Sequence, residues 1–202
     1  TSSNTAVATS TGNTVTITGA GTSTITAHQV GDTNYNEAAD VTQALTISKK
    51  QLSITGLAAQ DKVYDQTTSV VVTDMPVYSG LVNGDSFSVS GTVTWAFPDK
   101  NVGAGKTLVP TGNYNSPSAN YTVLQPTLQA AITKKDIAIT AITAEDKAYD
   151  GTVTAAFSNV SSTSVFAGDT VAFAVSGSFS DANAGLDKSV TIVAINLLGT
   201  DG

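Results

Sequence analysis

The sequence predicts an all-β protein built from small tandem repeats. Of its 202 residues, 41% are hydrophobic and only 12% are charged, which is too apolar for a disordered chain and too poorly charged for a typical helical bundle. Short runs alternate between polar and apolar residues, as half-buried strands do. Two long segments also repeat one another. We therefore expect tandem small β-sandwiches, Ig-like or of a related β-repeat type.

Alternating residues indicate where the strands lie. We expect strands at 14–18, 23–27, 52–55, 87–89, 137–140, 171–175 and 190–193. Gly, Asn and Asp residues, which favour turns, separate these runs. No segment shows convincing helical periodicity, and the best helical candidate is a short turn at 35–39.

The internal repeat organises the whole chain. Residues 49–68 read KKQLSITGLAAQDKVYDQTT, and residues 134–153 read KKDIAITAITAEDKAYDGTV. Each copy continues with a Gly-Asp pair and then a Phe-x-Asp-x-Asn-x-Gly run. Double lysines, Lys49-Lys50 and Lys134-Lys135, separate the units with almost no linker. Such short junctions predict repeats arranged as an extended rod.

These matches divide the chain into three domains. We expect an incomplete unit at 1–48, a complete unit at 49–133 and a truncated unit at 134–202. An incomplete unit would expose a strand edge that could pair with another chain. Residues 1–48 of one molecule could then complete residues 134–202 of the next and build a fibre. The alternative is that the chain is a window from a longer repeat protein.

The repeated motif resembles a known family. The run Asp146-Lys-Ala-Tyr-Asp-Gly-Thr152, with the later Gly168-Asp169, resembles the bacterial YDG-type repeat domain. The other copy departs from the pattern at Gln66, where glycine is expected. Residues 1–48 look like the second half of an Ig-like, MBG-type repeat. The resemblance implies long, secreted or surface-anchored, adhesin-like bacterial proteins, and it brings no catalytic residues.

The Tyr-Asp motif could be interpreted as part of an active site, but its presence in both copies argues against that interpretation. Catalysis needs one organised constellation, whereas a fold needs the same corner in every copy. We therefore expect tyrosine to pack and hydrogen-bond, aspartate to cap a tight turn, glycine to allow a positive φ, and lysine to pair with a carboxylate. The residues concerned are Lys62, Tyr64, Asp65, Lys147, Tyr149, Asp150 and Gly151.

Repeated aspartates leave calcium open as an alternative to turn formation. The candidates are Asp65, Asp85, Asp150 and Asp169. Calcium requires six to eight converging oxygen ligands, and these spacings match neither an EF-hand nor a nonapeptide repeat. No other cofactor is expected. An internal amide or ester cross-link involving Lys62 or Lys147 is a further alternative.

Trp95 and His28 each occur once in the chain and are candidate site residues. Trp95, the only tryptophan, is expected to pack in a core or interface, with contact to a sugar as the alternative. His28, the only histidine, cannot form a histidine-based zinc site alone. No Gly-x-Ser-x-Gly nucleophile elbow is present. We therefore expect that the chain is not an enzyme.

Charge narrows the range of partners. The net charge of −7 disfavours nucleic acid, and no apolar run approaches the roughly 20 residues that span a bilayer. We expect a structural spacer in an extracellular adhesin or filament at the bacterial cell surface, with neighbouring repeats or copies of itself as partners. The alternative is a carbohydrate- or protein-binding module that contacts a glycan or another cell-surface ligand.

Overall fold

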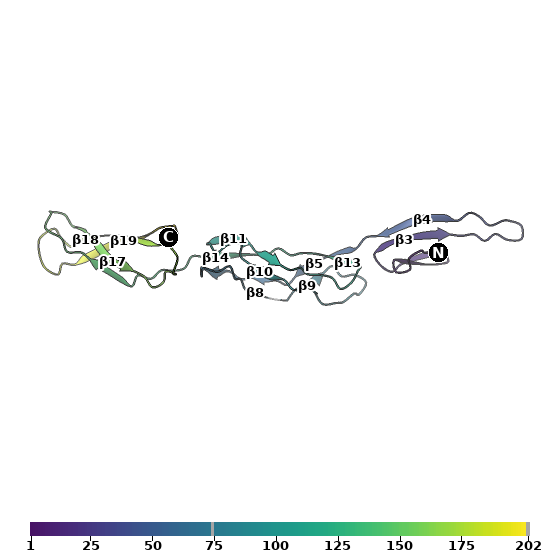
Figure 1. Cartoon of the computed structure of the whole chain (residues 1–202), viewed down its shortest axis with the longest axis horizontal. Helices are drawn as coiled ribbons and strands as arrows, with labels where there is room; N and C mark the ends of the chain where they lie inside the picture. Colours follow the sequence, from purple (N-terminus) through teal and green to yellow (C-terminus); the bar gives the residue numbers. More distant parts are fainter. Residues whose placement is uncertain (74, 201–202) are drawn as a thin grey trace. The chain divides into compact units, whose positions relative to one another are not determined.

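Strands and turns make up the protein. The computed structural model describes residues 1–73 and 75–200, and within these ranges it contains strands but no helix (Figure 1). Helical segments long and apolar enough to cross a membrane are accordingly absent from the same ranges. The predicted all-β class is confirmed.

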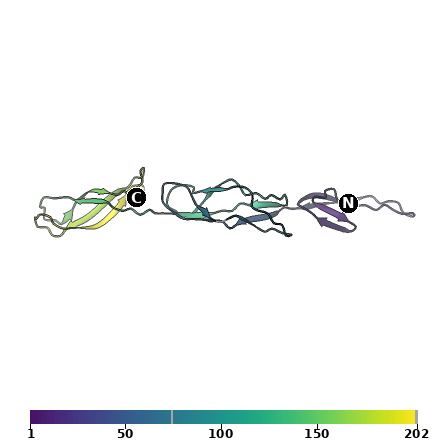
Figure 2. The same cartoon turned by 90° about the horizontal axis from the view of Figure 1, so that it is seen from below.

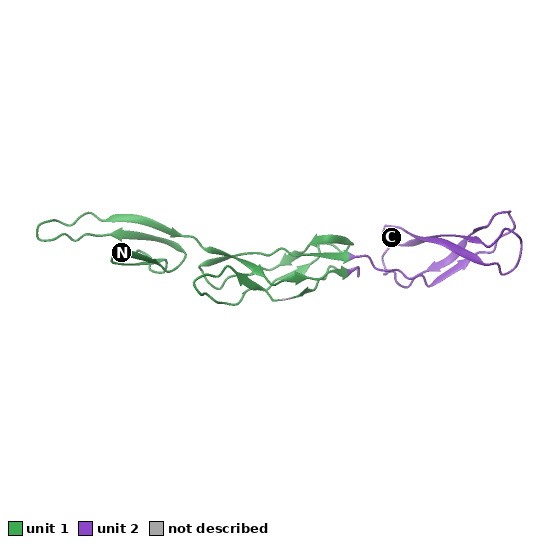
Figure 3. Ribbon diagram, turned by 180° about the vertical axis from the view of Figure 1, so that it is seen from behind, with its two compact units in different colours: residues 1–62, 68–132 green, residues 63–67, 133–202 purple. Residues whose placement is uncertain are grey.

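The chain divides into two compact units (Figure 3). The first contains Thr1–Lys62 and Thr68–Ile132, and the second contains Val63–Thr67 and Thr133–Gly202. By sequence, Val63–Thr67 belongs to the repeat at 49–133. This short segment therefore packs in a different compact unit from most of its own repeat.

Most strands are short. Those of the first unit, including two at its boundary, are β1 (Ala8–Thr11), β2 (Thr14–Ile17), β3 (Gly21–Ala27), β4 (Val41–Ile47), β5 (Lys50–Thr55), β6 (Ala58–Ala59), β7 (Lys62–Val63), β8 (Val72–Thr73), β9 (Val77–Ser79), β10 (Thr94–Ala96), β11 (Gly103–Thr107), β12 (Val109–Thr111), β13 (Tyr121–Leu124) and β14 (Gln129–Thr133). Those of the second unit are β15 (Ala141–Ala144), β16 (Thr154–Ala155), β17 (Phe157–Ser161), β18 (Ala172–Phe179) and β19 (Val190–Leu198).

Two antiparallel hairpins form most of residues 1–48. β1 pairs with β2, and β3 pairs with β4 along its whole length. Val7 and Ala8 are buried, but most side chains of β4 are exposed. The Ala20 amide donates to the Asn120 side-chain oxygen at 2.8 Å. This bond ties the hairpin region to residues of the complete repeat within the first unit.

The complete repeat has a core of its own. Along β5, alternate side chains point to opposite faces, and Leu52 and Ile54 are only 0% and 8% exposed. β5 lies between β13, which runs parallel to it, and β9, which runs antiparallel. β13 pairs with Lys50–Ser53 and β9 with Ser53–Thr55, so every residue of β5 has a partner strand on one edge at least while the apolar face is buried.

β14 is the second central strand of this repeat. It lies between β11 and β7, and its register with β11 places Ala130 opposite Lys106 and Ile132 opposite Gly103. Ala130 and Ile132 lie on one face and are 4% and 1% exposed. β14 therefore completes the sheet and supplies core side chains.

The second unit contains fewer buried side chains. β18 lies between β16 and β19 in one sheet, and β15 pairs with β17 in another (Figure 2). Gly177 lets Phe157 approach β18, since a Cβ at this position would lie 2.6 Å from the ring. Ala155 is the one buried hydrophobic residue in the described part of this unit. Its sheets are paired, but its core is open.

Two predicted strands and the predicted helical turn are wrong. Residues 137–140 form no strand, and the Ala138 amide donates to Ser164 Oγ at 3.3 Å, outside any β-ladder. Residues 87–89 also form no strand, because Phe87 is held by its ring between Tyr78 and Tyr121 rather than by a backbone ladder. Residues 35–39 contain a bend and no helical turn, with the Asp32 carboxylate capping the loop through the Tyr35 amide.

Candidate functional site

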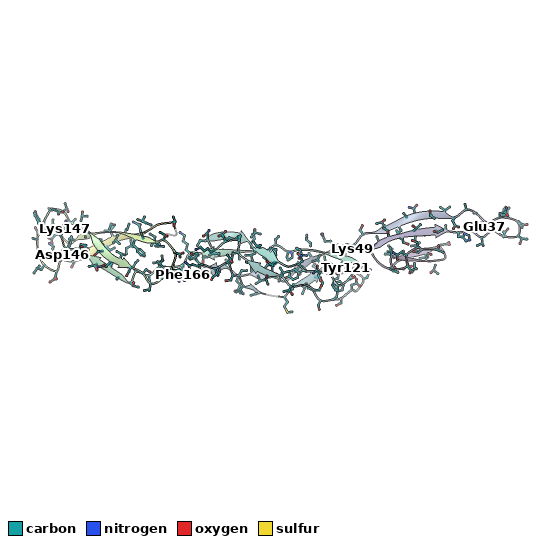
Figure 4. All side chains as sticks on the ribbon, viewed as in Figure 1. Glu37, Lys49, Tyr121, Asp146, Lys147 and Phe166 are labelled. Carbon is teal, nitrogen blue, oxygen red and sulfur yellow. The ribbon has the colours of Figure 1, made fainter. Side chains whose placement is uncertain are left out.

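Lys147 binds the loop that contains Tyr149 and Asp150 in the second unit (Figure 4). This loop, residues 146–154, is called the Tyr-Asp corner below. The Lys147 ammonium donates to the carbonyl of Thr152 at 2.9 Å, to the hydroxyl of the same residue at 2.8 Å, and to the carbonyl of Thr154 at 3.2 Å. It also pairs with the Asp150 carboxylate at 2.8 Å and lies 5.9 Å from the centre of the Phe179 ring. One ammonium thus contacts Asp150, Thr152 and Thr154, and so connects both ends of this loop.

Asp150 closes the tight turn that this lysine surrounds. Its carboxylate accepts the Thr152 amide at 2.8 Å and the Thr152 hydroxyl at 2.9 Å. Gly151, between them, has a φ of +75°, which glycine adopts without steric cost. Hydrogen bonds from Lys147 and then from Thr152 lower the pKa of Asp150 to about 2.

The complete repeat forms the same turn from a slightly different sequence. Asp65 accepts the Thr67 amide at 2.9 Å and the Thr67 hydroxyl at 2.8 Å. Gln66, in the place of glycine, still adopts a φ of +65°. Lys62 lies 5.5 Å from the centre of the Phe97 ring, as Lys147 does over Phe179. The departure at Gln66 therefore leaves the Asp-to-Thr turn unchanged.

The two tyrosines of the motif have different environments. Within the second unit, the Tyr64 hydroxyl donates to Asp169 at 2.9 Å, and its ring meets Phe166 edge-on at 6.0 Å. Gln66 supports this contact by donating to the same carboxylate at 2.8 Å. Tyr149 is 73% exposed, and its hydroxyl has no hydrogen-bond partner among the residues that the structure describes.

A second lysine corner is present in each repeat and was not predicted. Lys106 donates to the Asp99 carboxylate at 2.7 Å and to the Asn101 carbonyl at 2.9 Å. In the second unit, Lys188 makes the same bonds to Asp181 and Asn183. The available signal was a lysine that follows the aspartate by seven residues in both copies. The lysine hydrogen bond lowers the pKa of Asp99 and of Asp181.

Each Gly-Asp turn accepts a tyrosine hydroxyl. In the complete repeat, Tyr121 donates to Asp85 at 2.5 Å, and this hydrogen bond raises the pKa of Tyr121. In the second unit, the corresponding Asp169 receives Tyr64 instead. The turn is therefore a place where a tyrosine docks, and the tyrosine comes from a different part of the repeat in each case.

The calcium candidates take part in separate contacts. Asp65 and Asp150 cap turns, while Asp85 and Asp169 accept tyrosine hydroxyls. Across residues 1–73 and 75–200, no three His, Cys, Asp or Glu side chains gather in a way that could hold a metal ion. Calcium binding remains an untested prediction.

The two single aromatic residues lie apart from the corners. Trp95, on β10, is partly buried, and its indole nitrogen is buried without a hydrogen-bond partner among the described residues. His28 contacts Asp40 at 2.5 Å, with about half of each side chain exposed. Neither residue joins the lysine corners into a larger constellation.

The repeated corner is matched by a protein-family comparison. The model of the YDG domain matches residues 48–130 and again residues 133–202. The chain belongs to the YDG domain family. The resemblance predicted from the motif is therefore confirmed, and the Lys-x-Tyr-Asp corner lies within both YDG repeats. Comparisons with curated proteins and with solved structures find no match.

Proposed function

We propose that the two YDG repeats act as a structural spacer in an extracellular adhesin or surface filament of a bacterium. The observation that supports this most strongly is how the polar groups of the motif are used. Lys147, Asp150 and Thr152 bond to one another, and the complete repeat forms the same Asp-to-Thr turn. These groups stabilise a corner in each copy. In this proposal the chain is not an enzyme.

The second lysine corner supports the same proposal. Lys106 and Lys188 each close a loop onto an aspartate and a backbone carbonyl, and their side chains are only 12% and 17% exposed. A charged side chain this well covered is held by its partners. A spacer needs such loops to keep their shape in every repeat, whatever is attached at either end. The extended arrangement of the repeats belongs to this proposal.

Residues 1–48 fit the proposal as a further repeat of a different type. Their hairpins β1–β2 and β3–β4 are consistent with part of an Ig-like repeat of the MBG type. In this proposal, a series of β-repeats of two types lengthens the spacer and adds no catalytic function. Neighbouring repeats, or copies of the chain, are then its direct partners.

Location at the cell surface is the part of the proposal that an experiment can test most directly. Antibodies raised against residues 1–202 should label intact, non-permeabilised cells of the source organism, and brief protease treatment of those cells should remove the label. An antibody against a cytoplasmic protein provides the control and should label only permeabilised cells. Labelling of the YDG segment that also requires permeabilisation would contradict the proposal.

Trp95 provides the test of the alternative, a carbohydrate-binding module. Its indole N–H is turned into the protein, where it cannot donate to a sugar. We therefore expect no glycan-array signal that the Trp95→Ala substitution abolishes. A saturable signal lost in that variant, with the Trp95→Phe variant still folded, would favour the binding module over the spacer.

A further inference from the structure

One exposed turn of the complete repeat joins an asparagine to a glycine. Asn83 and Gly84 form the centre of the turn that leads to Asp85, and both are exposed. Their φ angles are +56° and +74°, and the Asp85 amide donates to the Val82 carbonyl at 3.0 Å. Two positive φ angles with this hydrogen bond define a type I′ turn, for which Asn-Gly is a favoured pair. The turn is therefore a regular one, closed by the bond between Asp85 and Val82.

The two groups that could react with one another in this turn are not engaged elsewhere. The Asn83 carboxamide and the Gly84 amide have no hydrogen-bond partner among the described residues. A Cβ added at Gly84 would meet nothing within 4 Å, so no neighbour crowds the peptide that joins the two residues. Glycine has no side chain to block its own nitrogen, which can therefore approach the side-chain carbonyl carbon of the preceding asparagine. The sequence contains this pair once, at 83–84.

Both sides of the turn bind Tyr121, the first residue of β13 (Figure 4). Its hydroxyl donates to the Asp85 carboxylate at 2.5 Å and accepts the Val82 amide at 3.3 Å. Tyr121 is only 5% exposed, its ring meets Phe87 edge-on at 5.6 Å, and β13 pairs with β5. The length of the turn therefore sets where the Asp85 carboxylate meets a tyrosine of the core.

The second YDG repeat forms the corresponding turn without an asparagine. This turn ends at Asp169, whose amide donates to the Phe166 carbonyl at 3.2 Å. Its two central residues are Ala167 and Gly168, so alanine stands in the place of Asn83. The fold therefore accepts this turn with or without an asparagine, and of the two repeats only the complete one carries the reactive pair.

The Asp-Gly pair of the Tyr-Asp corner is the contrasting case. An aspartate before glycine can close the same ring, but its ionised carboxylate is a poor target for a nucleophile. Lys147 pairs with the Asp150 carboxylate at 2.8 Å and lowers its pKa to about 2, and Thr152 donates two hydrogen bonds to it. This carboxylate is therefore ionised and held away from reaction with the Gly151 nitrogen, whereas the Asn83 carboxamide is uncharged and has no such bonds.

We propose that Asn83 is a site of spontaneous modification, at which the turn converts its own asparagine into isoaspartate and so loosens Tyr121. The Gly84 nitrogen attacks the Asn83 Cγ and closes a succinimide ring, while the Cγ–Nδ2 bond breaks and ammonia leaves with the proton of the Gly84 amide. Water then adds to the former main-chain carbonyl carbon of Asn83 and breaks its bond to the Gly84 nitrogen, which takes up a proton. The main chain now runs through Cβ and Cγ, one carbon longer, and the former carbonyl is a carboxylate. This inference goes beyond the proposed spacer function and does not depend on it.

Incubation of the full chain in neutral buffer at physiological temperature tests the chemistry. The peptide that contains Asn83 should gain about 1 Da over weeks and become a substrate for an isoaspartate-specific methyltransferase. Asn113 and Asn115, each followed by a residue with a side chain, are internal controls and should remain unchanged. Asn83→Gln should slow the conversion by at least about tenfold, because its longer side chain would have to close a larger ring. Gln66, at a φ of +65°, shows that glutamine fits such a backbone conformation in this protein.

Amide hydrogen exchange of the incubated chain tests the structural consequence. In the isoaspartate form, the amides of β13 should exchange at least about tenfold faster, because the longer turn moves the Asp85 carboxylate away from Tyr121. The amides of β18 in the second unit should be unchanged. Asn83→Asp adds the same charge without the extra carbon, and its β13 should stay as protected as in the unmodified chain.

Three outcomes would overturn the proposal. These are conversion at Asn83 no faster than at Asn113, conversion of the Asn83→Gln variant at the wild-type rate, and formation of isoaspartate that leaves the exchange of β13 unchanged. Equal loss of protection in Asn83→Asp would assign the effect to charge and would overturn the role of chain length. Cell-surface labelling is measured independently, so failure of this inference and failure of the spacer function are distinguishable.

Discussion

Lys147 shows why a single residue of the motif is repeated along the chain. Three acceptor oxygens of Thr152 and Thr154 and one carboxylate oxygen of Asp150 surround its ammonium. In water each of these groups would be solvated separately, whereas here one cation binds a turn and the strand that follows it. Charge-assisted hydrogen bonds of this kind are stronger than neutral ones.

Replacing this lysine should loosen the corner. Lys147→Met keeps the aliphatic stem against Phe179 and removes the donors, so we expect the melting temperature of the second unit to fall by roughly 5 °C. Lys134→Met, at an exposed lysine of the same unit, provides the control and should change it little. Thermal unfolding followed by circular dichroism measures both. An unchanged melting temperature for Lys147→Met would contradict this role.

Asp150, Asp99 and Asp181 predict how stability depends on pH. Lysine hydrogen bonds lower the pKa of all three carboxyls in the folded protein, in Asp150 to about 2, against about 3.9 in the unfolded chain. The stabilisation is therefore complete above about pH 4 and is lost as the pH falls through the folded-state values. We expect the melting temperature to drop between about pH 4 and pH 2.

Variants test this pH dependence. Asp150→Asn removes one titrating group and should show a smaller drop over the same range, from a lower starting value at pH 7. Asp187→Asn, which removes an exposed carboxyl without a hydrogen-bond partner in the described part of the chain, should follow the wild type. A drop in Asp150→Asn as large as that of the wild type would contradict the assignment.

At the level of the element, β5 and residues 137–140 show how a partner decides secondary structure. Both segments alternate apolar and polar residues and follow a double lysine. β5 is paired on both edges, and its Leu52 and Ile54 are buried. Residues 137–140 lie in no ladder, and among the described residues only the Thr140 amide at their end reaches a strand, donating to the Ser161 carbonyl of β17 at 2.9 Å. Alternation therefore predicts which residues suit a strand, but pairing forms it.

This difference predicts unequal effects of equivalent truncations. Leu52→Ala should lower the free energy of unfolding of the complete repeat by about 3–5 kcal/mol, because it leaves a cavity in a closed core. Ile137→Ala, in a half-covered position, should lower that of the second unit by about 1 kcal/mol. Urea denaturation followed by residue-resolved hydrogen exchange measures the free energy of unfolding of each unit separately. Equal losses would indicate that the second unit is as closed as the first.

At the level of the whole molecule, the boundaries of the sequence repeats differ from the boundaries of the compact units. Family matching assigns residues 48–130 to one YDG repeat, but Val63–Thr67 packs in the second compact unit. Tyr64 and Gln66 account for this, since both donate to Asp169. The Lys135 ammonium lies 5.1 Å from the centre of the Phe166 ring, which is the ring that Tyr64 meets edge-on.

Tyr64 and Tyr149 form a natural pair of variants to test this arrangement. Tyr64→Phe removes the bond to Asp169 and should destabilise the second unit by about 1–2 kcal/mol, although Tyr64 belongs by sequence to the preceding repeat. Tyr149→Phe removes a hydroxyl that is exposed and unbonded in the described structure and should have almost no effect. Residue-resolved hydrogen exchange of β18 and β19 measures both. Equal effects of the two variants would contradict the docking of Tyr64.

The sequence by itself determined the features that each residue carries locally. Thr- and Val-rich alternation, turn-forming residues and the duplicated motif were enough to predict an all-β chain, two YDG copies and the position of the Tyr-Asp turns. These predictions succeeded because propensity, turn chemistry and repetition depend on residues close together in the chain. The Lys106 and Lys188 corners had a local signal too, in their constant spacing from aspartate.

Tertiary structure alone decided which groups of the two copies find partners. Nearly the same segment is a buried strand at Leu52–Ile54 and forms no strand at Ile137–Ile139, and the same motif tyrosine is docked at Tyr64 and exposed at Tyr149. The physical reason is that strand pairing and burial depend on residues distant in the sequence: β13 and β14 close one repeat, and no described strand takes their place in the other.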